Sequence, residues 1–405
     1  MRVIGLFAGI GGLELGVSHA GAQPALLCEV DQGAQAVLRQ RFPDVPLHSD
    51  VTTLRKIPAA ELWTAGFPCQ NLSLVGNNAG IFGSQSGLVG EVFRLLHSAK
   101  PAPRWVLLEN VPFMLWQKKG EAIRHITGEL ERLGYRWAYR IIDTRSFGIP
   151  QRRRRVLLLA SRSEDPRTVL FAEDAGERLI LDDGVVPCGF SWTEGRAGLG
   201  WAVDAVPTLK GGSAIGIPSP PAIWFRTEGL IATPEIRDAE RLQGFEADWT
   251  QVLVGGKPLR VGARWKLVGN AVSVPVSTWF GEQLRTPGHF DAARSPTLWN
   301  GAVWPNAAWG ERGRVYPVWI SEWPRNCQHI GLTGFLAYGT KPLSPKATAG
   351  FLRRARGGSL NFADGFLDSV EDYLIRIDPL RAGEFRNSNN AVKIRIPATQ
   401  ESFAL

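Results

Sequence analysis

Short apolar runs alternate with helical patterns through the first 160 residues, and this alternation restricts the possible folds more than any other feature of the chain. Strands are expected at residues 3–7, 24–29, 62–67, 105–109, 137–143 and 156–161, and helices up to residue 19 and at 31–42, 90–98 and 121–133. The pattern predicts an α/β fold with a mostly parallel mixed sheet and helices on both faces. Ligands of such sheets bind beyond the carboxyl ends of the strands.

The pattern breaks near residue 165, which indicates further domains. Residues 166–258 are rich in glycine, proline and tryptophan, and predict a small, irregular, β-rich domain. Residues 259–286 predict a helical return to the domain formed by residues 1–165. Residues 287–405 are expected to form a C-terminal extension of unknown role. Its crowded tryptophans favour packing over stacking on nucleic-acid bases; they are Trp299, Trp304, Trp309, Trp319 and Trp323.

The charge of the chain favours a polyanionic partner. The formal net charge is +8 over 405 residues, and a basic balance is compatible with nucleic acid without proving it. The stretch Gln151-Arg152-Arg153-Arg154-Arg155 concentrates this charge just before an apolar strand. Because alternate residues of a strand share a face, Arg153 and Arg155 are expected to point the same way.

Neither a membrane segment nor a metal site is expected. The apolar runs are too short to cross a bilayer, and the first residues lack the pattern of a secretory signal, so we expect a cytoplasmic protein with no membrane partner. None of the four cysteines lies within four residues of another, which argues against a metal knuckle. They are Cys28, Cys69, Cys188 and Cys327. A disulfide framework is equally unexpected in a chain this large.

Three features at successive strand ends indicate a cofactor that contains adenosine. The turn Phe7-Ala8-Gly9-Ile10-Gly11-Gly12 joins the first strand to the first helix, where backbone amides can approach a polar ligand. Glu29 ends the second strand, where a carboxylate can accept hydrogen bonds from ribose hydroxyls. Asp50-Val51 follows near the third strand and could contact the adenine amino group. Each feature alone would be weak evidence, but their order supports the prediction.

Two further strand ends carry reactive groups. Gly66-Phe67-Pro68-Cys69-Gln70 leads from a strand into a loop, which would expose the thiol beside the cofactor. Taken alone, Cys69 is more simply a packed thiol. Glu109 ends the buried run that starts at Trp105, where a carboxyl group can donate a hydrogen bond or a proton to a ring nitrogen. A helix cap or an ion pair is the simpler alternative for that residue.

Together these segments resemble the cytosine-5 DNA methyltransferase family over residues 1–286. The family's blocks occur in its order: Phe7 to Gly12, Glu29-Val30-Asp31, Asp50-Val51, Gly66 to Gln70, Glu109-Asn110-Val111, Gln151 to Arg155, Arg241 to Phe245 and Gly269-Asn270-Ala271-Val272. The resemblance implies a Rossmann-like S-adenosylmethionine-dependent methyltransferase fold. The small domain would then recognise the DNA target, and Thr208-Leu209 matches a short element found there.

The resemblance also implies a role for each matching residue. Cys69 would attack carbon 6 of a flipped-out cytosine, Glu109 would protonate N3, and Arg155, with Arg153, would complete the catalytic set. Positions matching the S-adenosylmethionine pocket are Phe7, Ala8, Gly9, Ile10, Gly11, Glu29, Val30, Asp50, Val51, Pro68, Leu88, Asn270, Ala271 and Val272. Contacts to double-stranded DNA are expected from Gln70, Ser73, Gln151, Arg153 and Thr208. The resemblance implies no metal and suggests a monomer; a cognate restriction endonuclease is left open as a partner.

Three other functions are disfavoured. A branch of the family that methylates transfer RNA carries a Cys-Phe-Thr tripeptide, which is absent here. A silent DNA-binding regulator would not need Cys69, Glu109 and Arg155 together. A nucleotide-dependent oxidoreductase would need a third glycine where this chain has Glu14. One departure from the family is the segment 81–88, which lacks the acidic residue and arginine that many members carry there. The DNA target would be read by side chains of the small domain, which beyond Thr208-Leu209 and the block from Arg241 to Phe245 shares no motif with the family.

Overall fold

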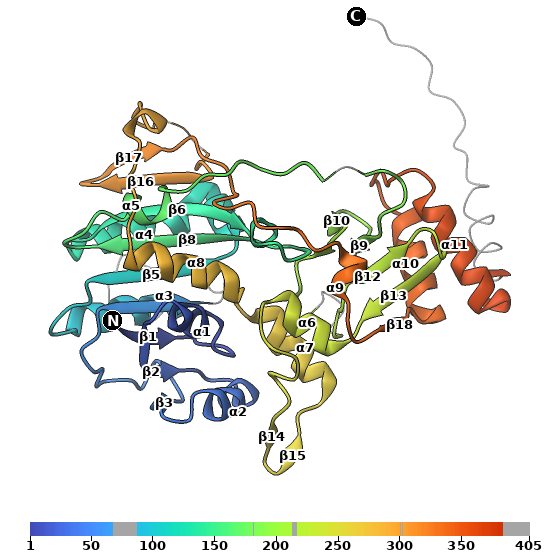
Figure 1. Cartoon of the computed structure of the whole chain (residues 1–405), viewed down its shortest axis with the longest axis horizontal. Coiled ribbons are helices and arrows are strands. Elements are labelled where there is room, and N and C mark those ends of the chain that lie inside the picture. Colours follow the sequence, from blue (N-terminus) through green and yellow to red (C-terminus); the bar gives the residue numbers. More distant parts are fainter. Residues whose placement is uncertain (68–86, 181, 213–216, 300, 302, 384–405) are drawn as a thin grey trace, which may run out of the picture.

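The computed structural model describes residues 1–67, 87–180, 182–212, 217–299, 301 and 303–383. Its main sheet has nine strands in the order β17-β16-β6-β8-β5-β4-β1-β2-β3 (Figure 1). In chain order they are β1 (Arg2–Leu6), β2 (Gln23–Cys28), β3 (Leu47–His48), β4 (Leu62–Gly66), β5 (Trp105–Asn110), β6 (Arg136–Asp143), β8 (Arg154–Ser161), β16 (Ala307–Glu311) and β17 (Arg314–Pro317). All six strands expected from the sequence are confirmed, and so is the fold class.

The sheet is mixed, and its strand order reverses between β1 and β4. Strands β8 and β16 run antiparallel to their neighbours, whereas β1 to β5 pair in parallel. From β1 the chain moves outward to β2 and β3, and then returns to β4 and β5 on the other side. Ligands bind at the carboxyl ends of the strands at such a reversal. Both the glycine turn after β1 and the segment after β4 begin there.

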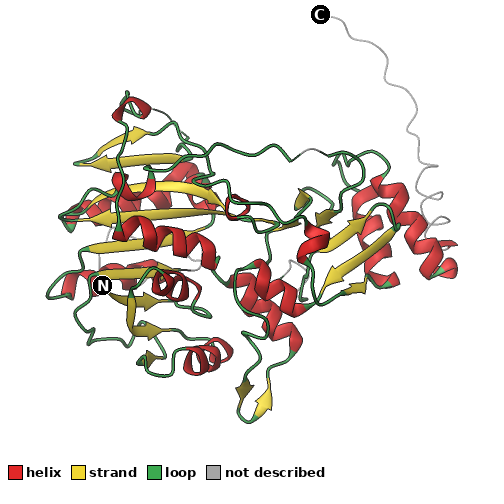
Figure 2. Ribbon diagram, in the orientation of Figure 1, coloured by secondary structure: helices red, strands yellow, loops and turns green. Residues whose placement is uncertain are grey.

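Helices cover both faces of this sheet (Figure 2). The helices of the main domain are α1 (Gly12–His19), α2 (Gln32–Arg41), α3 (Gly87–Ser98), α4 (Glu121–Arg132), α5 (Arg167–Leu170) and α8 (Val274–Arg285). One core contains Val92 of α3 and Ile126 of α4, and the other contains Val17 of α1 and Phe280 of α8. The side chains on both faces of the central strands therefore pack into apolar cores, which explains why the sequences of these strands are continuously apolar.

A second, antiparallel sheet forms the small domain, in the order β10-β9-β12-β13-β18. Its strands are β9 (Cys188–Phe190), β10 (Trp201–Val203), β12 (Ala222–Phe225), β13 (Leu230–Pro234) and β18 (Thr340–Pro342). Figure 1 shows α6 (Ile236–Leu242) and α7 (Val261–Asn270) between the two sheets. Two further two-stranded sheets are the hairpin of β14 (Leu253–Val254) and β15 (Lys257–Pro258), which projects away from α7 in Figure 1, and the parallel pair of β7 (Gln151–Arg152) and β11 (Val206–Pro207). Short 3-10 turns occur at 112–115, 117–120, 144–147 and 292–294.

The C-terminal extension contributes to both sheets. It adds β16 and β17 to the main sheet and β18 to the small one, together with α9 (Leu332–Phe335), α10 (Pro345–Arg356) and α11 (Phe366–Ile377). Figure 1 shows α10 and α11 packed beside β12 and β13. Trp304 and Trp323 are buried, as the packing interpretation predicts, whereas Trp319 is 69% exposed. The domain boundaries given above remain a proposal. No helix in the described part of the chain is long and apolar enough to span a membrane.

Candidate active site

The turn between β1 and α1 has a backbone that needs glycine. Gly9 and Gly11 have φ angles of 57° and 86°, in the left-handed region. A Cβ on Gly12 would collide with the carbonyl oxygen of Val272, so this glycine permits close packing of the segment that follows α7. A Cβ on Gly9, in contrast, would meet nothing within 4 Å. The turn therefore presents backbone to open space at the start of α1, which suits a polar ligand.

Glu29 holds the second strand end against this turn. Its Oε2 accepts a hydrogen bond from the Gly9 amide at 2.8 Å, and its Oε1 accepts from the amides of Val30 at 2.9 Å and Asp31 at 2.8 Å. The large apolar side chain of Val30 is 70% exposed. The carboxylate and the exposed apolar side chain thus lie beside the open glycine turn. This combination fits the ribose and the base of an adenosyl group.

Asp50 lies after β3 and is oriented by its own turn. The backbone amide of Thr52 donates to Oδ1 at 2.8 Å, and the Thr52 hydroxyl donates to the same atom at 2.8 Å. These two hydrogen bonds lower the pKa of Asp50, with a smaller contribution from His48. The carboxylate therefore stays charged near neutral pH, and a charged acceptor strengthens a hydrogen bond from an amino group. Val51, next to it, is buried, and Leu88 of α3 packs against the same core.

Glu109 and Arg155 meet between β5 and β8. The Arg155 Nε lies 3.1 Å from Glu109 Oε1, and the two side chains are 14% and 9% exposed. Although this distance defines an ion pair, Oε1 accepts no well-directed hydrogen bond among the described residues. Arg155 also donates from Nη1 to the Arg154 carbonyl at 2.7 Å. The carboxyl group thus keeps hydrogen-bonding capacity for a ligand while the guanidinium orients it.

The same carboxyl group faces the end of β4. Gly66 pairs with Glu109 across the two strands, and a Cβ on Gly66 would lie 3.6 Å from Glu109 Oε2. Asn110 donates from its side-chain amide to the Phe67 carbonyl at 3.0 Å, which fixes the chain two residues before Cys69. The predicted site residues Pro68, Cys69, Gln70 and Ser73 lie outside the described residues.

Two of the other three cysteines are poor nucleophiles. Burial raises the pKa of the Cys28 thiol to about 12, with additional repulsion from Glu29 and Asp50. Burial likewise raises the pKa of the Cys188 thiol to about 11. Since the thiolate is the reactive form, neither side chain is suited to attack a substrate near neutral pH. Cys327 is half-buried and lies in the C-terminal extension.

Gln151 and Arg153 are internal residues rather than surface contacts. Strand β8 begins at Arg154, so the alternation that pairs Arg153 with Arg155 on one face does not extend to Arg153. The Arg153 side chain is buried and donates to the carbonyls of Leu209 at 3.1 Å and Ala271 at 2.6 Å. Its burial, reinforced by the nearby charge of Arg155, lowers its pKa, and Glu109 opposes this effect.

Gln151 connects the same segments. It is buried, donates to the Leu242 carbonyl at 2.6 Å and accepts from the Leu209 amide at 3.1 Å. The Thr208 hydroxyl donates to the Arg152 carbonyl at 2.9 Å. The polar groups of Gln151 and Arg153 form hydrogen bonds inside the protein, so we propose that these two residues have positioning roles in place of the expected DNA contacts. Through these hydrogen bonds they connect the small domain to the strand ends.

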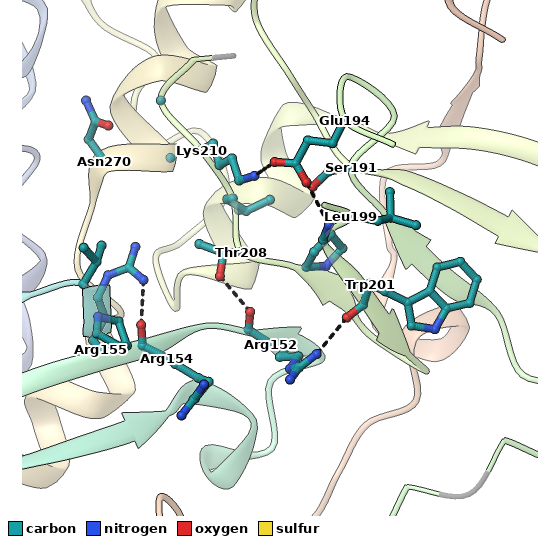
Figure 3. A pocket seen from close by; sticks show the side chains of 17 residues that line it. Arg152, Arg154, Arg155, Ser191, Glu194, Leu199, Trp201, Thr208, Lys210 and Asn270 are labelled. Atoms are coloured by element: carbon teal, nitrogen blue, oxygen red, sulfur yellow. Dashed lines mark hydrogen bonds and ion pairs between the residues drawn. The ribbon is translucent and has the colours of Figure 1, made fainter. Parts of the chain in front are cut away.

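A cavity of about 580 Å³ separates the strand ends from the small domain (Figure 3). From the main domain it is lined by Pro112 and Arg155, and from the end of α7 by Asn270. Ser191, Glu194, Trp201 and Lys210 line it from the small domain. No motif in the sequence points to Ser191, Glu194 or Trp201, whereas Lys210 directly follows the Thr208-Leu209 element. Among the described residues, no group of histidine, cysteine and acidic side chains could hold a metal ion.

Glu14 of α1 is a buried carboxyl group that contacts Thr64 of β4. Its side chain is fully enclosed, accepts a hydrogen bond from the Thr64 hydroxyl at 2.9 Å, and has a pKa raised to about 7, mainly by burial. A folded pKa above the ordinary 4.5 means that this residue favours folding at low pH and that the benefit is lost as pH rises toward 7. We therefore expect Glu14→Gln to gain stability relative to the wild type between about pH 5 and pH 8, by up to roughly 3 kcal/mol.

Urea unfolding of both proteins across this range measures the difference directly. Other titrating groups cancel in the comparison, because they are common to both proteins. A difference in unfolding free energy that stays constant with pH would contradict the buried, titrating carboxyl group.

The sheet, its glycine turn and the site at the strand ends define an α/β protein whose ligands bind where the strand order reverses. Residues 1–177 match the model of a family described as C-5 cytosine-specific DNA methylase. Type II methyltransferase M2.BsuMI of Bacillus subtilis (strain 168) is 47% identical over 381 residues, which cover 92% of this chain and 97% of that protein. The chain therefore belongs to the C-5 cytosine-specific DNA methylase family, and the resemblance drawn from its motifs is confirmed.

More distant proteins agree with this assignment. Type II methyltransferase M.MspI of Moraxella sp is 27% identical over 304 residues, which cover 70% of each protein. The crystal structure of S. pombe Dnmt2 methyltransferase is similar with a TM-score of 0.52 at 18% identity, covering 70% of this chain and 98% of that one. At this identity the similarity shows a common fold only.

Proposed function

We propose that this DNA cytosine-5 methyltransferase uses S-adenosylmethionine to methylate a cytosine that is rotated out of double-stranded DNA into the cavity beside Arg155. The observation that carries the proposal is the Glu109–Arg155 pair at the end of β5, next to the strand from which the chain continues to Cys69. A thiol, a carboxyl group and a guanidinium are the groups that this chemistry needs on one pyrimidine.

The residues at the ends of β1, β2 and β3 would hold the cofactor. The open turn at Gly9, the Glu29 carboxylate and exposed Val30 fit its adenosine part, and Asp50 fits the adenine amino group. Asn270, which lies at the end of α7 and lines the cavity, would close the pocket with Ala271 and Val272. When bound, S-adenosylmethionine supplies an electrophilic methyl group.

The chain's own residues activate the cytosine. The Cys69 thiolate adds to carbon 6, and Glu109 delivers a proton to N3, which prevents negative charge from accumulating on the ring. Arg155 holds Glu109 and the cytosine O2 oxygen, so that the ring lies in one orientation. Carbon 5 becomes nucleophilic through this addition. After methylation a base removes the carbon 5 proton, and the Cys69 sulfur leaves as the ring regains its double bond.

The activity test uses purified protein with methyl-labelled S-adenosylmethionine and either duplex DNA or transfer RNA. We expect label in 5-methylcytosine from DNA digests and none in transfer RNA. Label in transfer RNA alone would overturn the choice of substrate. Stabilisation against heat by S-adenosylmethionine, but not by NAD, would support the cofactor assignment; the reverse result would overturn it.

We further propose that this methylation protects a restriction site. The support is the similarity to proteins named type II methyltransferases. Methylated positions mapped in DNA from expressing cells would define the target, and DNA carrying that mark should resist an endonuclease that cleaves there. We propose that the enzyme acts as a monomer, which the mass of the protein–DNA complex would test.

A further inference from the structure

Lys210 is a cation of the cavity whose backbone is firmly fixed. The preceding residue, Leu209, donates its amide to Gln151 at 3.1 Å and accepts a hydrogen bond from Arg153 at 3.1 Å. A Cβ on Gly269 would collide with the carbonyl group of Lys210, so the two backbones are in close contact. The Lys210 side chain therefore starts from a defined position beside the cavity.

The Lys210 ammonium forms an ion pair with Glu194 across the edge of the cavity (Figure 3). The two side chains are 39% and 33% exposed. The other carboxylate oxygen of Glu194 accepts a hydrogen bond from the Gly200 amide at 2.8 Å. Arg354 of α10 donates to the carbonyls of Trp192 at 2.6 Å and Glu194 at 3.2 Å. Glu194 would therefore stay in place if Lys210 moved away from it.

Two of the other three basic residues that line the cavity, Arg154 and Arg155, are more strongly committed than Lys210. Arg154 forms a two-pronged ion pair with Glu322, and Arg155 holds Glu109. Arg152 donates to the Trp201 carbonyl at 3.3 Å. An exposed ion pair between flexible side chains is weak, because water solvates both charges well. Lys210 can therefore exchange Glu194 for another anion at a lower cost than Arg154 or Arg155 could exchange their less exposed carboxylate partners.

We propose that Lys210 binds a backbone phosphate beside the cytosine that enters the cavity, and that Glu194 holds its ammonium in the absence of DNA. This inference rests on the proposed function, since it places the extruded nucleotide next to Arg155. The sugar-phosphate backbone of that nucleotide must then run along the edge of the cavity, where Lys210 lies. A lysine is a point charge on a flexible stem, which suits a phosphate better than the reading of a base edge.

The main test measures DNA affinity as a function of salt. One lost phosphate contact lowers the slope of log K against log salt by about 0.9, and it weakens binding roughly tenfold at 0.1 M salt. We expect this result for Lys210→Ala both on a duplex that the wild type methylates and on an unrelated duplex. Lys210→Arg should retain the wild-type slope. Stabilisation by S-adenosylmethionine should be the same in all variants, because Lys210 lies outside the proposed cofactor pocket.

A matched control removes one positive charge elsewhere. Lys100 is exposed and precedes β5, so it lies near the amino end of that strand, whereas the cavity lies at the carboxyl end. Lys100→Ala should leave the slope unchanged. Glu194→Gln keeps an acceptor for Gly200 but removes the competing charge, and should bind both duplexes more tightly than the wild type.

A wild-type slope and affinity for Lys210→Ala, with the wild type active on DNA, would overturn this inference and leave the proposed function intact. So would weaker DNA binding by Glu194→Gln, since that result would make Glu194 a support for DNA binding and not a competitor. Failure of the wild type to methylate DNA would instead overturn the proposed function.

Discussion

Replacing Glu109 with glutamine is expected to lower kcat for DNA methylation by roughly 10²–10⁴-fold, the range that a positioned general acid contributes. Glutamine has the same size but carries no acidic proton for the ring nitrogen. The cavity and the cofactor residues should be preserved, because Glu109 lies apart from the turn at Gly9 and from Glu29. Single-turnover methylation measures the chemical step, and heat stabilisation by S-adenosylmethionine checks that the cofactor still binds.

A glutamate-to-glutamine substitution near the opposite end of β5 provides the control. Glu164 forms an exposed ion pair with Arg104, which lies just before β5, at 2.5 Å. Glu164→Gln should leave kcat within about twofold of the wild type, because exposed ion pairs contribute little. Nearly normal turnover by Glu109→Gln would show that N3 is protonated by another group.

The second large effect is expected from Phe366→Ala in the C-terminal extension. The Phe366 ring is fully buried in α11, and its centroid lies 5.0 Å from those of Phe190 and Trp201 and 5.3 Å from that of Trp224. Removing a buried aromatic ring costs about 3–5 kcal/mol. Because Trp201 also lines the cavity, we expect DNA affinity to fall together with the stability of the small domain.

Urea unfolding and DNA binding measure these two effects. Leu380→Ala is the control, since Leu380 belongs to the same extension but is 85% exposed, and its change should stay within about 0.5 kcal/mol. A loss below about 1 kcal/mol for Phe366→Ala, with normal DNA binding, would mean that the extension is an accessory and not part of the small domain's core.

The main domain could be predicted from sequence because its signals are local. The apolar run from Trp105 to Leu108 and that from Val156 to Ala160 are buried on both faces, so each appears as a continuous hydrophobic stretch. The turn from Phe7 to Gly12 is also a local signal. Its glycines are needed because Gly9 and Gly11 have positive φ angles and Gly12 packs closely against Val272.

The remaining features depend on contacts between distant segments. Strand β16 pairs with β6, so that Ala307 to Gly310 adjoins Trp137 to Arg140, and no local pattern indicates that partner. The position of Arg153 is set by the carbonyls of Leu209 and Ala271, far from it in sequence. The ion pair between Lys210 and Glu194 could not be predicted either, because the fold of the small domain brings the two residues together. The shared motifs thus indicate the chemistry, whereas the arrangement around it follows from long-range packing.

The most direct test of the central claim is a trapping experiment with duplex DNA in which 5-fluorocytosine replaces cytosine throughout. Fluorine cannot be removed as a proton is, so a thiol that has added to carbon 6 stays bound after methylation. With S-adenosylmethionine present, the wild type should form an adduct that survives denaturation and maps by mass spectrometry to Cys69, and Cys69→Ser should form none. An adduct at another cysteine, or none from an enzyme that methylates ordinary DNA, would contradict the account.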